Sequence, residues 1–287
     1  MTEFVALPLL VTFATAFLAT SVHARLRADV AAKLTAMALA TLVVAAVPTL
    51  WLMGSSGLRH LGVRSPFTDW SSHLLPSFGV AGGILGALVF VLMLAGSVRI
   101  LRVLRLHRRL RASEPSEVEI LPSTAVFAYT LPGPAGNIIL SEGLVSSLSE
   151  RERDVVIAHE RAHAQHRHDR YLLLGRVATA LLPFVRPIAD RLEFSLERWA
   201  DDEAALEFDD RRLVATAIGR VAAAGRHPSP AVAGIARLGA AARAEALLSP
   251  VPKPVPPHPA VGVAGLALVI TIVSVSYTHL TLPTKIV

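Results

Sequence analysis

The 287-residue chain contains no cysteine. Disulfide bonds and thiolate zinc sites are therefore excluded, and any metal ion must be held by histidine and carboxylate side chains. Charged residues are also scarce, at 17% against 53% hydrophobic residues, and this balance excludes an ordinary soluble protein. The formal net charge of +6 comes largely from arginines beside apolar runs. It indicates contact with anionic lipid headgroups rather than with nucleic acid.

Three apolar runs lie in the first third of the chain. Each approaches the roughly 20 residues that a helix needs to cross the hydrocarbon core of a bilayer. Buried helices of a large soluble core are the alternative, which three such runs in 98 residues disfavour. We therefore predict three transmembrane helices within residues 1–98, at residues 4–22, 34–53 and 78–98.

Basic residues predict how these helices are oriented. Three follow the first run and six arginines lie in a basic juxtamembrane segment, residues 99–113, whereas residues 54–77 carry only two. The positive-inside rule therefore places the N-terminus outside the cell membrane and everything after the third run in the cytoplasm. Direct nucleic-acid binding by the arginine-rich segment is disfavoured, because its position beside a membrane helix suits lipid headgroups better.

The C-terminal part of the chain carries a linker and a further apolar run. Residues 249–259 contain six prolines and are predicted to form a semi-rigid linker. Residues 260–274 read as a fourth membrane helix that is short for a full span. Residues 275–287 include VSYTHLTLPT, which resembles the translation of a sequencing adapter. We expect an assembly artefact there that truncates the fourth helix.

Residues 155–163, VVIAHERAH, carry the pattern His-Glu-x-x-His on an apolar helix. Residues four apart project from the same helix face, so His159 and His163 can hold one zinc ion between their rings. Glu160 lies beside them and can accept a proton from a water molecule at that zinc. The sequence therefore predicts a metal site at His159 and His163, with Glu160 as its catalytic general base.

A second helical stretch, residues 189–208, offers the third metal ligand. Glu197 and Asp201 are again four residues apart. We expect Glu197 to bind the metal and Asp201 to accept the free ring N–H of a ligand histidine. Taken alone, these acidic residues would more simply form a solvated surface. The upstream motif favours the metal interpretation.

Three further polar residues follow the motif. His166 lies on the face of the two ligand histidines but about 4.5 Å of helical rise beyond His163, too far along to share zinc with His159. We predict that His166 and His168 form polar helix surface and that Asp169 is a local orienting group.

Short strands are predicted between the basic segment and the metal motif. Residues 118–120, 125–129 and 137–140 have β-type patterns separated by proline and glycine. A hairpin there would present an exposed edge, on which an extended peptide can bind through backbone hydrogen bonds. Ser149 and Glu152 form a predicted capping box at the start of the metal helix.

The segment AHERAHAQHRHD, followed by ERWADDEAA, resembles the gluzincin metallopeptidases, whose third ligand lies in a Glu-x-x-Ala-Asp motif. The likeness runs from about residue 123 to residue 248. Two branches share the motif: membrane peptidases of the M48 type, related to the heat-shock protease and CAAX-processing enzymes, and the M56 family of β-lactam-sensing signal-transducer peptidases. Three spans before the metal helix and a fourth after it resemble the M56 order.

The resemblance implies a mainly α, multi-pass membrane protein with a small α+β zinc peptidase domain at residues 114–248, between the third and fourth spans. It implies one Zn²⁺ per chain and endopeptidase activity on a protein or peptide substrate near the inner membrane face. In the signalling branch that substrate is a cytoplasmic transcriptional repressor. The extracellular sensor domain of β-lactam-sensing members is not visible in this sequence. Either the chain is a short member without a sensor or the truncation removed it, so the resemblance identifies neither a specific ligand nor a specific repressor.

Two other functions are open at this point. The chain could be an M48-type membrane quality-control protease, or a catalytically silent membrane receptor or scaffold. Glu160 argues against the silent receptor, because a purely structural zinc site does not require that carboxylate. A nucleic-acid-binding membrane protein, the least favoured interpretation, predicts a salt-sensitive interaction with DNA.

Overall fold

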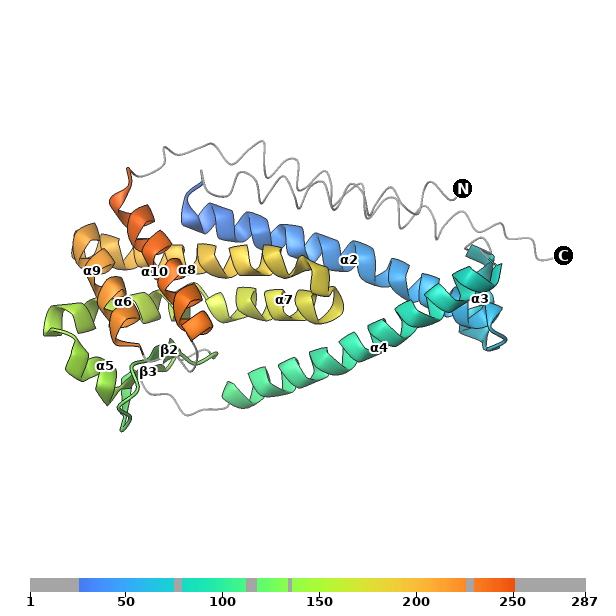
Figure 1. The fold of residues 1–287 in the computed structure, drawn as a ribbon, viewed down its shortest axis with the longest axis horizontal. Coiled ribbons are helices and arrows are strands. Elements are labelled where there is room, and N and C mark those ends of the chain that lie inside the picture. The colour runs from blue at the N-terminus through green and yellow to red at the C-terminus, as the bar shows by residue number, and fades with distance from the viewer. Residues whose placement is uncertain (1–25, 75–78, 112–117, 134–135, 226–229, 251–287) are drawn as a thin grey trace.

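The structure is a computed structural model, and it describes residues 26–74, 79–111, 118–133, 136–225 and 230–250. It is mainly helical with one small sheet (Figure 1), which confirms the predicted mainly α fold with a small β component. The first and fourth predicted membrane helices lie outside the described residues. So do most of the proline-rich linker and the stretch that resembles an adapter.

Two long apolar helices, α2 (Ala28–His60) and α4 (Gly79–Leu110), form a V whose arms meet beside α3 (Pro66–Leu74; Figure 1). By length and composition, both are apolar enough to cross a membrane, and they contain the second and third predicted spans. Where the arms meet, a Cβ atom on Gly57 would lie 2.5 Å from the Cα atom of Gly86. The close approach therefore requires glycine at Gly57.

Helix α4 exposes an apolar surface along most of its length. Ile84, Leu88 and Leu92 are each more than half exposed, and such a surface suits lipid better than water. The predicted boundary between the third span and the basic segment at residues 99–113 is not a break in the helix. α4 continues to Leu110, so most of the arginines lie on its last turns.

A helical hairpin lies between the arms of the V (Figure 1). It consists of α7 (His168–Leu181), a 3₁₀ turn (Pro183–Val185) and α8 (Arg186–Phe208). α8 begins three residues before the predicted start, because proline in its first turn suits a helix N-terminus. The hairpin shares a core with α2, in which alanines allow close packing: Ala28, Ala32, Ala36, Leu39 and Leu42 of α2 lie with Ala178, Leu181, Leu192, Leu196 and Trp199.

The three predicted strands are present as β1 (Val118–Leu121), β2 (Ala128–Thr130) and β3 (Ile138–Ser141). The buried β3 is central; it pairs parallel with β1 and antiparallel with β2. β2 begins three residues later than predicted. It is an edge strand and lies against α6 (Glu150–Gln165), the helix of the metal motif. The short helix α5 (Glu142–Ser147) follows β3 directly.

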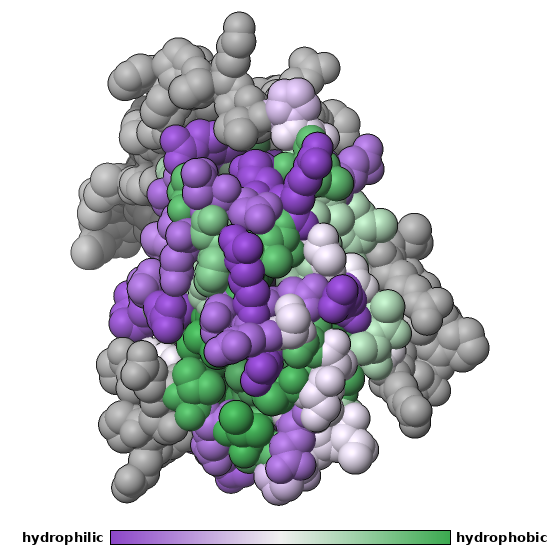
Figure 2. Space-filling view, turned by 90° about the vertical axis from the view of Figure 1, so that its left-hand side faces the viewer, coloured by the Kyte–Doolittle hydropathy of each residue, from purple (hydrophilic) through white to green (hydrophobic). Residues whose placement is uncertain are grey.

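Helices α9 (Arg211–Ala224) and α10 (Pro230–Leu248) complete the end of the molecule that carries α6. Val155 and Ala158 of α6 share a core there with α8, α9 and α10. Figure 2 shows this end of the molecule: hydrophilic residues are spread over it, between smaller hydrophobic patches. Such a surface suits water, in contrast to the apolar surface of α4.

The predicted capping box at the start of α6 is confirmed. The Ser149 hydroxyl accepts a hydrogen bond from the Glu152 backbone N–H, and the Glu152 carboxylate accepts one from the Ser149 N–H at 2.9 Å. Glu152 is buried, and Arg220 of α9 lies 2.9 Å from its carboxylate. This one side chain therefore fixes the start of the motif helix and joins it to α9.

Replacing Glu152 by Gln is expected to destabilise the protein at neutral pH but not at acid pH. The hydrogen bond from the Ser149 side chain holds the pKa of the Glu152 carboxyl below its usual 4.5, despite burial. Its stabilisation is therefore present above pH 4.5 and is lost as the pH falls through the lowered pKa of the folded state. We expect a loss of about 1 kcal/mol in the free energy of unfolding at neutral pH. Denaturant titrations across this range check it; a pH-independent difference would contradict it.

Candidate metal centre

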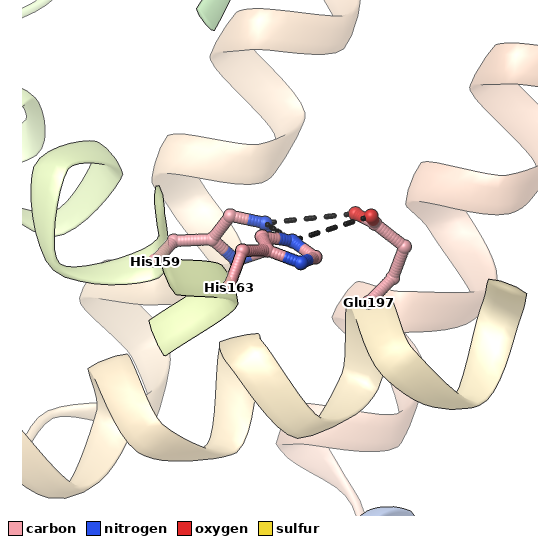
Figure 3. A group of neighbouring side chains, drawn as sticks. All are labelled: His159, His163 and Glu197. Carbon is pink, nitrogen blue, oxygen red and sulfur yellow. Dashed lines mark hydrogen bonds and ion pairs between the residues drawn. The ribbon is translucent and has the colours of Figure 1, made fainter. Parts of the chain in front are cut away.

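The rings of His159 and His163 on α6 face the carboxylate of Glu197 on α8 (Figure 3). The two Nε2 atoms lie 3.1 Å apart. Oxygens of Glu197 lie 3.5 Å from the Nε2 of His159 and 3.4 Å from the Nε2 of His163. Within the described part of the chain, this is the one group of three or more His, Asp or Glu side chains that could hold a metal ion.

These spacings fit a metal ion. In a tetrahedral zinc site with bonds of about 2.0–2.1 Å, the ligand atoms lie roughly 3.3 Å from one another. Two imidazole nitrogens and one carboxylate oxygen are also a ligand set of catalytic zinc sites, in which a further position stays open. The structure thus brings the three residues predicted as ligands together with the donor atoms that zinc requires.

Asp201 lies one turn after Glu197 on α8 and is almost fully buried. Its Oδ1 lies 2.9 Å from the Nδ1 of His159, which is the contact expected of a carboxylate that orients a ligand histidine. Burial alone would lower the pKa of His159, but hydrogen bonds to Asp201 and Glu197 outweigh it and raise the pKa to about 10. Without a metal ion, the ring is therefore protonated at neutral pH.

Arg243 of α10 is a member of the site that the sequence analysis did not predict. Its Nη1 lies 2.8 Å from a carboxylate oxygen of Glu197. Its Nε and Nη2 donate to the two oxygens of Asp201 at 2.7 and 2.6 Å. Burial raises the pKa of the Asp201 carboxyl, but the hydrogen bonds from Arg243 and His159 outweigh this and hold the pKa below its usual value. The guanidinium therefore keeps Asp201 ionised.

His168 is fully buried, so its prediction as helix surface was wrong. The prediction assumed that one helix continues through residue 168. Instead α6 ends at Gln165, Arg167 adopts a left-handed backbone conformation with φ of 54°, and α7 begins at His168. The turn directs the ring back toward α6, where its Nδ1 lies 2.8 Å from the Nδ1 of His163. Burial, together with neighbouring histidines, lowers the pKa of His168 to about 3, so the ring is neutral.

The carboxylate of Glu160 is hydrogen-bonded to a residue of the sheet. Glu160 is buried, and the hydroxyl of Thr130, the last residue of β2, donates to its Oε2 at 2.8 Å. The same hydroxyl oxygen lies 2.8 Å from the backbone carbonyl oxygen of Glu160. The edge strand therefore contacts the predicted general base directly.

The two remaining polar residues after the motif, His166 and Asp169, have different surroundings. His166 is partly exposed, as predicted; its Nε2 lies 3.3 Å from a Glu203 oxygen, and its ring packs on Trp199. Asp169 was predicted to be a local orienting group. Its carboxylate oxygens lie 3.7 Å from the Nε2 of His107 on α4 and 3.7 Å from the Nε of Arg167, both beyond hydrogen-bond distance, so the orienting role stays a prediction.

Comparison with known families gives one match, over part of the chain. Residues 99–223 match the model of peptidase family M48. The match extends from α4 through α6 and α8 to α9, and it supports an M48-type metallopeptidase domain, a class that is typically zinc-dependent. Arg243 lies beyond the matched residues. No curated protein and no solved structure matches the chain.

Proposed function

We propose that the protein is a membrane-embedded zinc endopeptidase that hydrolyses peptide bonds of a cytoplasmic or membrane-proximal protein. The observation that carries the proposal is the convergence of His159, His163 and Glu197 beside the buried carboxylate of Glu160. The M48 match and the two long apolar helices support it. The distribution of basic residues supports an N-terminus outside the cell and a cytoplasmic peptidase domain.

The chain's own residues supply proton transfer and orientation. One zinc ion, held by the two histidines and Glu197, would supply the Lewis acidity that polarises the scissile carbonyl and makes water acidic. Glu160 takes a proton from the water as its oxygen adds to the carbonyl carbon. It then passes this proton to the amine nitrogen as the C–N bond breaks. Thr130 fixes the Glu160 carboxylate, and Asp201 fixes the ring of His159.

The edge strand β2 is suited to bind the substrate. Among the described strands it pairs with β3 alone, so no described strand occupies its other edge. An extended peptide can pair with such an edge whatever its side chains, which suits an endopeptidase. Because Thr130 in β2 contacts Glu160, a peptide paired with this strand would pass close to the general base.

We further propose that proteolysis is regulatory and that the substrate is a cytoplasmic transcriptional repressor, as in the M56 branch. The predicted order of spans supports this assignment. In addition, α2 shares a buried core with Leu196 and Trp199, which lie on either side of Glu197 along α8, and the Lys33 ammonium of α2 lies 4.8 Å from the Trp199 ring centroid. A signal that moves α2 in the membrane would therefore shift the third metal ligand.

Membrane quality control is the second candidate function, and the M48 match favours it. The two functions differ in selectivity. A signalling peptidase cleaves one regulator at a defined bond, whereas a quality-control protease cleaves many unfolded membrane proteins at many bonds. A catalytically silent receptor or scaffold is disfavoured, because the structure holds the Glu160 carboxylate in place beside the metal ligands.

The proposed function predicts that detergent-purified protein contains about one zinc ion per chain and cleaves peptides. A chelator should abolish cleavage of a quenched fluorescent peptide library, because the proposed mechanism relies on zinc to polarise the scissile carbonyl. Readdition of zinc should restore it. Elemental analysis and cleavage rates are measured on the same sample. Folded protein that binds no zinc would contradict the proposal.

A further inference from the structure

The buried contact between His168 and His163 is not used by the mechanism above. The two Nδ1 atoms lie 2.8 Å apart, a hydrogen-bond distance. A hydrogen bond between two ring nitrogens needs one N–H and one lone pair, so one histidine donates and the other accepts. Which histidine is the donor follows from the other ring nitrogen of His163, the Nε2 atom, which faces Glu197.

His163 presents its Nε2 to Glu197 and to the Nε2 of His159 (Figure 3). A nitrogen that binds a metal ion carries no hydrogen. In a neutral ring the hydrogen then lies on Nδ1, which points at His168. His163 is therefore the donor and the Nδ1 of His168 is the acceptor.

The ring of His168 is held firmly in this position. It is fully buried and lies against Trp199, with ring centroids 4.9 Å apart, and near Tyr171. The left-handed conformation of Arg167 fixes where α7 starts and so where the ring emerges. The Nε2 of His168 is buried without a hydrogen-bond partner among the described atoms. An apolar side chain of this shape would avoid that penalty, so the imidazole is unfavourable for packing alone.

We propose that His168 is the positioning residue of His163: its Nδ1 accepts the Nδ1–H of His163, and so fixes the tautomer and ring orientation with which His163 binds zinc. The inference rests on the proposed function. The two ligand histidines are then oriented by different groups, His159 by the carboxylate of Asp201 and His163 by a neutral imidazole. A neutral acceptor orients the ring without adding a further negative charge to a site that already holds the carboxylates of Glu160, Glu197 and Asp201.

Three variants separate this role from a structural one. His168→Phe keeps the ring shape and removes the acceptor. His168→Asn keeps an acceptor at the δ position on a smaller side chain, and His168→Leu is its apolar counterpart of similar size. We expect zinc affinity, measured by competition with a chromophoric chelator in detergent, to fall roughly 10–100-fold in the Phe and Leu variants and to stay within about threefold in the Asn variant. The metal-free Phe variant should melt at the same temperature as wild type or higher.

The outcomes distinguish this inference from the proposed function. If wild-type protein binds no zinc, the proposed function fails. If wild type binds zinc and the Phe and Leu variants bind it as tightly, the inference about His168 is wrong. Equal weakening in the Asn and Leu variants would also overturn it, because the acceptor would then have no effect. A lower melting temperature of the metal-free Phe variant with unchanged zinc affinity would show that the ring only packs.

Discussion

Replacing Glu160 by Gln is expected to reduce peptide hydrolysis about 10²–10⁴-fold while zinc remains bound. The amide has nearly the shape of the carboxylate but cannot take a proton from water. Its carbonyl oxygen can still accept the hydroxyl of Thr130, so the local structure should be kept. Glu160 is not among the three predicted ligands, so the metal content should not change. Cleavage rates and zinc content are measured on the same purified samples.

A matched control lies on the same helix. Glu150 is an exposed glutamate in the first turn of α6, and Glu150→Gln should cleave at the wild-type rate. Substantial cleavage by the zinc-loaded Glu160→Gln protein would contradict the role of general base. Loss of zinc from that variant would instead show that the carboxylate supports the metal site, and the assigned mechanism would then be wrong.

Features of the site that depend on local geometry could be predicted from the sequence. The spacing of four residues places His159 and His163 on one face of a helix whatever surrounds it. The capping box of Ser149 and Glu152 marks the start of that helix, because its hydrogen bonds join residues only three apart. The strands and the second helix were predicted from equally local patterns, with their ends displaced by three residues at most.

Features of the site that depend on tertiary structure could not be predicted from the sequence. The position of His168 follows from one arginine with positive φ, a conformation that Arg167 gives no reason to expect. The contact of Arg243 with the site follows from the packing of α10 across α8, which no spacing along the chain records. The shared core of α2 with α7 and α8 was equally hidden, because an apolar face predicts burial but not its partner.

Replacing Arg243 by Met is expected to destabilise the metal-free protein by about 3–5 kcal/mol. The guanidinium makes three contacts of 2.6–2.8 Å with the carboxylates of Asp201 and Glu197. Methionine keeps much of the apolar stem but leaves these carboxylates in a largely desolvated site without their cation. The free energy of unfolding is measured by denaturant titration in detergent. The exposed Arg212 of α9 provides the control, since Arg212→Met removes a charge outside the site.

Zinc binding should restore part of the unfolding free energy that Arg243→Met loses, because the bound ion brings positive charge to Glu197. We therefore expect the difference in unfolding free energy between wild type and variant to be smaller with zinc than without it. An equal difference in both forms would show that Arg243 acts only by packing α10 on α8, and no difference would contradict the ion pairs. By linkage, a variant that is destabilised more in its metal-free form must bind zinc more tightly. Arg243 would then stabilise the metal-free site at the expense of zinc affinity.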